Sequence, residues 1–247
     1  RKIYLASNDN YISLVQLALE EYTGITVSSS KLLIAGSRDY DAEMSIKIKD
    51  GADVYLTLRD VRLTSADQLP CIDVGEDAHL TINIEGDCRL INTGIHVSRG
   101  SRLELEGSGN LYIFAKGKEC YGIGSSFTEE MGEIIFNNSG NITVRADGDR
   151  AIAIGGGYYQ EGEGISLASG ALEISVASVD GIGIGCATGD VPLSIRNCRI
   201  DIDIHTNEGI GIGTLNGNQD ISVENFYISI KGSASALSGI GSPKAGG

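Results

Sequence analysis

The stretch Gly181-Ile182-Gly183-Ile184-Gly185 decides the fold, because near-copies of it return along the second half of the chain. The copies read YGIGS (121–125), AIAIG (151–155), GIGIG (209–213) and SGIGS (238–242). Their matching isoleucines, Ile123, Ile154, Ile184, Ile212 and Ile240, lie 31, 30, 28 and 28 residues apart. A repeat of this length indicates a solenoid, in which each unit buries its apolar side against the next unit.

Each repeat divides into three short strands separated by turns, as in 164–167, 171–176 and 181–185. Three strands in a circuit of roughly 29 residues predict a three-sided prism of parallel sheets. Parallel strands joined by crossovers are almost always right-handed, and the six-residue period of a left-handed helix is absent. We therefore expect an all-β fold, a right-handed parallel β-helix of about eight coils stacked ~4.8 Å apart, over residues 24–247.

The first 23 residues have a different pattern and predict an N-terminal cap. Asn8-Asp9-Asn10 offers helix N-caps, Leu14, Leu17 and Ala18 share one helical face, and Gly24 suits a helix end. A helix over about 10–22 would cover the open end of the solenoid, which otherwise exposes unpaired backbone. The alternative is one more irregular strand.

The alternation of side chains along each strand predicts which residues point into the prism and which point outward. If the repeated isoleucines point inward, Gly181 and Gly183 point outward and leave one face almost without side chains. Two interpretations stay open. The segments after each glycine strand fold back over this face, or the face is a flat groove for an extended ligand.

Aromatic and acidic residues beside the predicted groove favour a ligand. Phe127 and the pair Tyr158-Tyr159 follow the glycine strand at equivalent places in adjacent coils, where aromatic rings could stack on sugar rings. Carboxylates from the same segments could hold Ca²⁺, the one cofactor considered, or form a solvated acidic rim. These carboxylates are Glu129, Glu130, Glu161 and Glu163. The predicted ligand-binding set is Phe127, Tyr158, Tyr159, Glu161, Gly181 and Gly183.

Charge and composition exclude several classes of partner. The net charge of −14 argues against nucleic acid and against an anionic membrane surface. No apolar run reaches the ~20 residues of a membrane span. The five cysteines include no CxxC pair, so we expect five free, packed thiols. The chain starts at Arg1 rather than Met, so we expect it to be part of a larger multidomain chain.

The first half of the chain resembles a known repeat. The stretch CIDVGEDAHLTINIEG (71–86) is similar to the xAIDVGDGAxLTIxLEG coil of large secreted proteins of Gram-positive, often gut-dwelling, bacteria. GIHVSRGSRLELEGSG (94–109) resembles the same coil, and GxGIGGG-type coils follow, so that the resemblance spans about 24–241. It implies a carbohydrate-binding or adhesin-like β-helix that is secreted or attached to the cell wall, with glycan or Ca²⁺ binding. It carries no catalytic signature.

An enzymatic reading rests on carboxylates of the outer strands. Asp201, Asp203 and His205 alternate on one strand at ~6.6 Å spacing, and Asp147 with Asp149 forms a second pair. Charges alternating on a solvated sheet give the same pattern, and motifs of pectin hydrolases are absent. His79, His96 and His205 lie in scattered coils without metal-ligand spacing. The sequence thus predicts a glycan-binding or adhesive module without assigned catalytic residues. The alternatives are a structural stalk, and a polysaccharide lyase or hydrolase.

Overall fold

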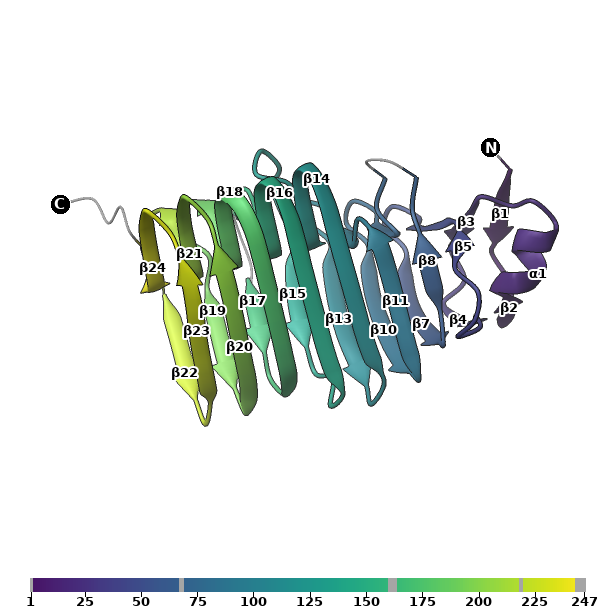
Figure 1. Ribbon diagram of the computed structural model, residues 1–247. Coiled ribbons are helices and arrows are strands. Elements are labelled where there is room, and N and C mark those ends of the chain that lie inside the picture. The colour runs from purple at the N-terminus through teal and green to yellow at the C-terminus, as the bar shows by residue number, and fades with distance from the viewer. Residues whose placement is uncertain (1, 67–68, 160–163, 218–219, 243–247) are drawn as a thin grey trace.

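The computed structural model describes residues 2–66, 69–159, 164–217 and 220–242 and confirms the predicted β-solenoid (Figure 1). Parallel strands stack along one axis, and the chain visits three sides in turn. Within the described residues one side is a nine-stranded sheet, close to the about eight coils expected. The other two sides belong to one 15-stranded sheet, because some long strands bend around the corner between them.

We number the sides in the order in which the chain visits them. The first side contains β1 (Ile3–Ala6), β3 (Gly24–Val27), β6 (Ser45–Ile48), β9 (Ile72–Val74), β12 (Ile95–Val97), the C-terminal parts of β14 (Asn110–Gly124), β16 (Asn141–Gly156) and β18 (Gly170–Thr188), and then β21 (Glu208–Asn216) and β24 (Ala236–Gly241).

The second side is the nine-stranded sheet. It consists of β2 (Tyr11–Ser13), β4 (Lys31–Ala35), β7 (Asp53–Arg59), β10 (His79–Glu85), β13 (Arg102–Gly107), β15 (Glu133–Phe136), β17 (Ile165–Leu167), β19 (Leu193–Arg196) and β22 (Ile221–Glu224). The third side consists of β5 (Ala42–Glu43), β8 (Arg62–Thr64), β11 (Asp87–Asn92), the N-terminal parts of β14, β16 and β18, and then β20 (Cys198–His205) and β23 (Tyr227–Ser233).

The repeated isoleucines form one continuous ladder on the first side. Each pairs in register with the next, in the order Ile25, Ile46, Ile72, Ile95, Ile123, Ile154, Ile184, Ile212 and Ile240. All but the last are buried in the main core. The period that decided the fold therefore fixes the register, and it extends into the first half of the chain, where the isoleucines are spaced less evenly.

The expected outward orientation of the glycines is wrong at Gly181 and Gly183. A Cβ on Gly181 would lie 3.0 Å from Val176 Cγ1 of the main core. Ile184 packs in the main core, but Ile182 belongs to a separate cluster on the outside. A Cβ on Gly183 would point inward, 3.3 Å from Ile202 Cδ1 and 2.4 Å from the Gly211 carbonyl oxygen. The register pairs the two isoleucines with their neighbours and skips Gly183 between them. Simple alternation breaks at this point, as it does at a bulge.

The N-terminal helix is shorter than expected. α1 spans Leu14–Leu19, with Ser13 as N-cap, whereas the sequence predicted a helix over about 10–22. Residues Tyr11–Ser13 instead form β2, because Ile12 pairs with Ile34 and is buried. The helix contacts β5, the first strand of the third side, and buries Leu14 and Leu17. A lid across the end of the solenoid stays a prediction.

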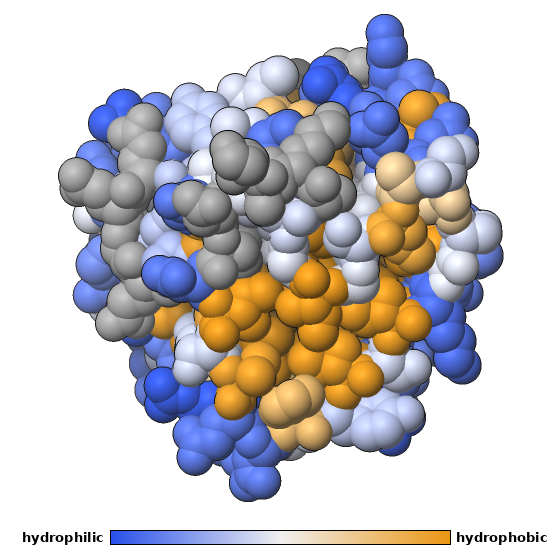
Figure 2. Space-filling model, turned by 90° about the vertical axis from the view of Figure 1, so that its left-hand side faces the viewer, coloured by the Kyte–Doolittle hydropathy of each residue, from blue (hydrophilic) through white to orange (hydrophobic). Residues whose placement is uncertain are grey.

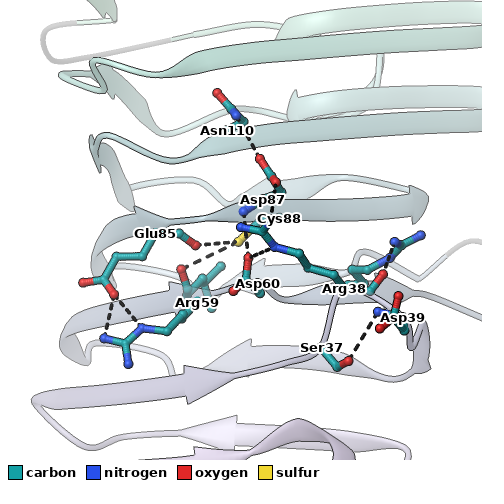
Figure 3. Close-up of polar contacts among 11 residues, drawn as sticks. Ser37, Arg38, Asp39, Arg59, Asp60, Glu85, Asp87, Cys88 and Asn110 are labelled. Atoms are coloured by element: carbon teal, nitrogen blue, oxygen red, sulfur yellow. Dashed lines mark hydrogen bonds and ion pairs between the residues drawn. The ribbon is translucent and has the colours of Figure 1, made fainter.

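Asp and Asn side chains connect successive turns at the corner between the second and third sides (Figure 3). Asp60 Oδ1 accepts hydrogen bonds from Arg38 Nε at 2.8 Å and from the Asp87 amide at 3.1 Å. Asp87 Oδ1 accepts from Asn110 Nδ2 at 2.8 Å, and Asn110 Oδ1 from the Asn141 amide at 3.1 Å. The Asp87 amide, followed by the Arg38 guanidinium, holds the pKa of the Asp60 carboxyl below its usual value. This row of polar side chains stabilises the corner, because its polar atoms form hydrogen bonds with one another across successive turns.

The cysteine prediction is confirmed. All five cysteines are free and buried. Burial raises the pKa of the Cys88, Cys120 and Cys186 thiols to about 12. The described residues contain no helix with the length and hydrophobicity needed to cross a membrane.

Candidate functional site

The face predicted as a flat groove on the first side is covered. Ile152, Ile182 and Ile210 point outward there, yet they are fully buried in a small apolar cluster. Tyr121, Phe127, Ala187 and Leu215 pack against them, from β14, the β14–β15 connection and the ends of β18 and β21. Gly181 and Gly183 are also buried. Of the two interpretations, the structure supports the one in which following segments fold back over this face.

The three predicted stacking residues do not form a platform. Tyr159 is only 8% exposed, and its hydroxyl accepts a hydrogen bond from the Gly164 amide at 2.8 Å. Phe127 is half-buried beneath the Arg150 guanidinium, 5.4 Å from the ring centroid. Tyr158 remains 37% exposed. Phe127 therefore packs against the outer cluster, and Tyr159 packs in the main core.

The predicted calcium ligands are only partly described. Glu161 and Glu163 lie outside the described residues. Glu129 lies 3.9 Å from His96 Nε2, and Glu130 lies 3.5 Å from Arg99 Nε, so the two carboxylates have separate partners. Across the described part of the chain, no group of three or more His, Cys, Asp or Glu side chains is arranged to hold a metal ion.

The outer surface of the third side is open and combines aromatic with acidic groups. Along β14 the buried Leu111 and Ile113 alternate with Tyr112 and Phe114, which are partly exposed. The two rings therefore lie side by side on the outer surface, ~7 Å apart along the strand. Arg89 stacks over Tyr112 at 5.5 Å, and Arg145 over Phe114 at 5.0 Å.

A shallow trough of about 320 Å³ lies next to Tyr112, whereas Arg145 separates Phe114 from it. It begins at Thr143, the register neighbour of Tyr112, and crosses β18, β20 and β23. Three of its lining residues are small, and their side chains leave space between the larger ones. They are Thr143, Ser175 and Ser229. Its polar walls are Glu173, Asp201, Asp203 and Lys231. We call Tyr112, Phe114 and this trough the third-side surface.

Of the carboxylates considered for catalysis, Asp201 and Asp203 line this trough, and both are paired with neighbours. Asp201 pairs with Arg199 at 2.9 Å, and Asp203 with His205 Nε2 at 3.1 Å. His205 Nδ1 lies 2.9 Å from Ser233 Oγ. Asp147 forms a two-pronged ion pair with Arg145. The outward direction predicted for Asp201 and Asp203 is confirmed, since both alternate with buried isoleucines.

Sequence reasoning missed the aromatic pair, although a signal was present. The alternation of Leu111 and Ile113 with Tyr112 and Phe114 is the pattern of a strand with two apolar residues inward and two rings outward. The predicted rings Phe127, Tyr158 and Tyr159 lie instead in segments that follow a strand, and such segments can fold back.

A second polar cluster was also missed because its members are far apart in sequence. His96 Nδ1 lies 2.8 Å from Asp73 Oδ1 and 3.4 Å from Ser98 Oγ, next to a cavity of about 350 Å³. Register brings it together, since Lys47, Asp73 and His96 are neighbours on the first side. Both Asp73 and Ser98 approach the same ring nitrogen, so this is not the arrangement of a Ser-His-Asp triad, in which they approach opposite nitrogens.

Comparison with protein-family models, curated proteins and solved structures gives no match for this chain. The third-side surface must therefore be interpreted from its own geometry.

Proposed function

We propose that the chain is a carbohydrate-binding module that holds an extended neutral glycan along its third-side surface. The observation that carries this proposal is the pair of outward rings, Tyr112 and Phe114, on the same side as an open trough of hydroxyls and carboxylates that begins next to Tyr112. The chain would act as a secreted or wall-attached adhesive module, in keeping with the repeat that it resembles.

The chemistry of the surface suits sugars. The apolar faces of pyranose rings stack on aromatic side chains, while hydroxyls bond to carboxylates and to Ser and Thr. Glu173, Asp201 and Asp203 would accept hydrogen bonds from sugar hydroxyls. The same carboxylates, within a chain of net charge −14, would repel a uronate or sulfated polymer. This favours a neutral glycan.

The repeat of the solenoid also suits an extended polymer. Neighbouring turns lie ~4.8 Å apart, which is close to the length of one sugar residue in an extended chain. Register places Tyr112, Thr143, Glu173, Asp201 and Ser229 in one row across successive turns. A glycan lying along this row would meet one outward side chain per sugar.

The first prediction tests this surface with Tyr112→Ala and Phe114→Ala. Calorimetry would use neutral oligosaccharides selected on a glycan array with the unchanged chain. We expect each substitution to weaken binding about tenfold, because loss of one aromatic contact costs about 1 kcal/mol or more. Thermal unfolding should change little, since both rings are partly exposed.

Tyr158→Ala is the matched control, because Tyr158 is a partly exposed ring on a different side. It should leave binding unchanged. Absence of binding to every neutral glycan would contradict the proposal and favour a structural stalk. If Tyr158→Ala abolished glycan binding and Tyr112→Ala did not, the glycan would bind to the first side rather than to the third-side surface. Cleavage of the glycan, abolished by Asp203→Asn, would instead indicate an enzyme.

A further inference from the structure

The C-terminal end of the solenoid exposes its core. Figure 2 looks onto this end and shows an apolar patch near its centre, with polar residues below it and to its right. In the last turn Val223, Leu237 and Ile240 are 42%, 38% and 53% exposed. Ile240 is the final member of the isoleucine ladder among the described residues, and it pairs with Ile212 on one side. The patch is thus the cross-section of the core.

The N-terminal end differs, because its inward side chains are covered. Ala6 on β1, Ile12 on β2 and Leu17 on α1 are each buried. Apolar residues are also exposed near that end, namely Ile3, Leu5, Tyr11 and Leu19. They alternate with buried or half-buried neighbours on β1, β2 and α1 and so point away from the core. The core is therefore covered at the N-terminal end and open at the C-terminal end of the described residues.

We propose that two copies of this chain pack their C-terminal ends against each other as a twofold-symmetric dimer. A head-to-tail contact would place the open core against a covered end and could repeat without limit. A contact between two C-terminal ends buries both open cores and closes after two copies. The proposal is independent of glycan binding, since the third-side surface runs along the length of the solenoid.

The edge strands support this arrangement. β22, β23 and β24 each pair on one side only among the described strands. A free edge with an apolar core behind it is a template for pairing with another chain. A twofold axis perpendicular to the solenoid axis places an edge strand against its own copy in antiparallel orientation, which a sheet accepts.

Size and charge also fit a dimer. The described last turn, residues 220–242, has 23 residues, and standard interfaces use about 20–30 residues a side. Its charged residues are Asp220, Glu224 and Lys231, a net charge of −1, whereas the whole chain carries −14. Electrostatic repulsion between two copies is therefore weaker at their C-terminal ends than elsewhere on their surfaces.

The second prediction is that the chain sediments as a dimer, with twice the 26.0 kDa mass of one chain. Ile240→Lys should raise the dissociation constant at least 100-fold, because it places a charge at the centre of the interface. Leu5→Lys is the matched control, an exposed apolar residue at the other end, and should leave the dimer intact. Circular dichroism of both variants checks that they fold.

Spin labels decide the orientation. Ser222→Cys on β22 and Lys2→Cys near the N-terminus are both exposed, and the native thiols are buried, so one label per chain attaches. Nine stacked strands make the solenoid roughly 40 Å long. Pulsed dipolar spectroscopy should give a short distance between Ser222→Cys labels and a distance of about 80 Å between Lys2→Cys labels. A monomer at all concentrations, a dimer unaffected by Ile240→Lys, an open-ended polymer, or a short Lys2→Cys distance would each overturn the proposal.

Discussion

At the scale of single residues, the position of Gly183 shows how tightly the core limits side chains. Its neighbours in the ladder direction are Gly211 and, one turn further, Gly239, while Ala153 fills the equivalent place in the preceding turn. A methyl group at 183 would meet the Gly211 carbonyl oxygen at 2.4 Å. Real Cβ atoms do not approach backbone so closely, so the turns would have to separate.

The third prediction is therefore that Gly183→Ala lowers stability by about 1–3 kcal/mol, the usual cost of overpacking a core. Gly239→Ala is the matched control, because the same position in the last turn has no atom within 4 Å of an added Cβ. Urea unfolding followed by circular dichroism measures both. Equal midpoints for the two variants would contradict the inward orientation of Gly183.

The same residue shows where sequence reasoning stops. The spacing of Ile154, Ile184 and Ile212 predicted their register, because identical residues at a fixed period can stack only with one another. The spacing could not show that Ile182 and Ile184, two residues apart, point to opposite faces of the sheet, Ile182 outward and Ile184 into the main core. Alternation assumes a regular strand, and the break at Gly183 is visible only when neighbouring strands are in place.

At the scale of elements, the outer cluster of Ile152, Ile182 and Ile210 stabilises the segments that cover the first side. It holds the β14–β15 connection and the ends of β18 and β21 against the first side through Phe127 and Leu215. Burial of Tyr121 among these groups raises the pKa of its hydroxyl. The cluster is separate from the main core, so the covering segments can loosen without unstacking the turns.

The fourth prediction compares Ile182→Ala with Ile184→Ala by hydrogen exchange. Ile182→Ala should speed exchange of the Ser125 and Met131 amides, which bond to the 155–158 segment, at least tenfold. Exchange on the third side, for example at Ile174, should stay slow. Ile184→Ala removes a ladder residue of the main core and should speed both, at a cost of about 2–5 kcal/mol. Identical patterns from the two variants would show that the clusters are not separate.

Elements also explain which site residues could be found from the sequence. Tyr112 and Phe114 lie on a strand and alternate with the buried Leu111 and Ile113, so the alternation in the sequence carries enough information to predict their outward direction. Tyr158 and Tyr159 lie in a connection, where local sequence does not fix direction, and one of them turned inward. The helix over 10–22 was overextended for a similar reason, because pairing of Ile12 with β4 overrides the local helical pattern.

At the scale of the whole molecule, the solenoid is a row of nearest-neighbour contacts whose ends differ. Each turn contacts the turns before and after it, so stability is close to a sum of turn energies and interface energies. The first turn has β3, β4 and α1 against it, and its inward residues are buried. The last described turn has a described neighbour in one direction only, and Val223 and Ile240 are exposed there.

The fifth prediction is that unfolding of the isolated chain starts at the C-terminal end. In Ile240→Lys, kept monomeric as argued above, amides of β22, β23 and β24 should exchange fastest among the strands, β19–β21 more slowly, and strands of the middle turns slowest. Each added turn buries several aliphatic side chains worth about 1.5–3 kcal/mol each, so protection should fall stepwise toward the open end. Uniform protection from β6 to β24 would mean that the solenoid unfolds as one unit, while fastest exchange at β1–β3 would mean that the N-terminal end is the weaker one. In the unchanged chain at high concentration, slower exchange confined to β22–β24 would follow if the partner copy supplies the missing neighbour, because only those strands gain a contact.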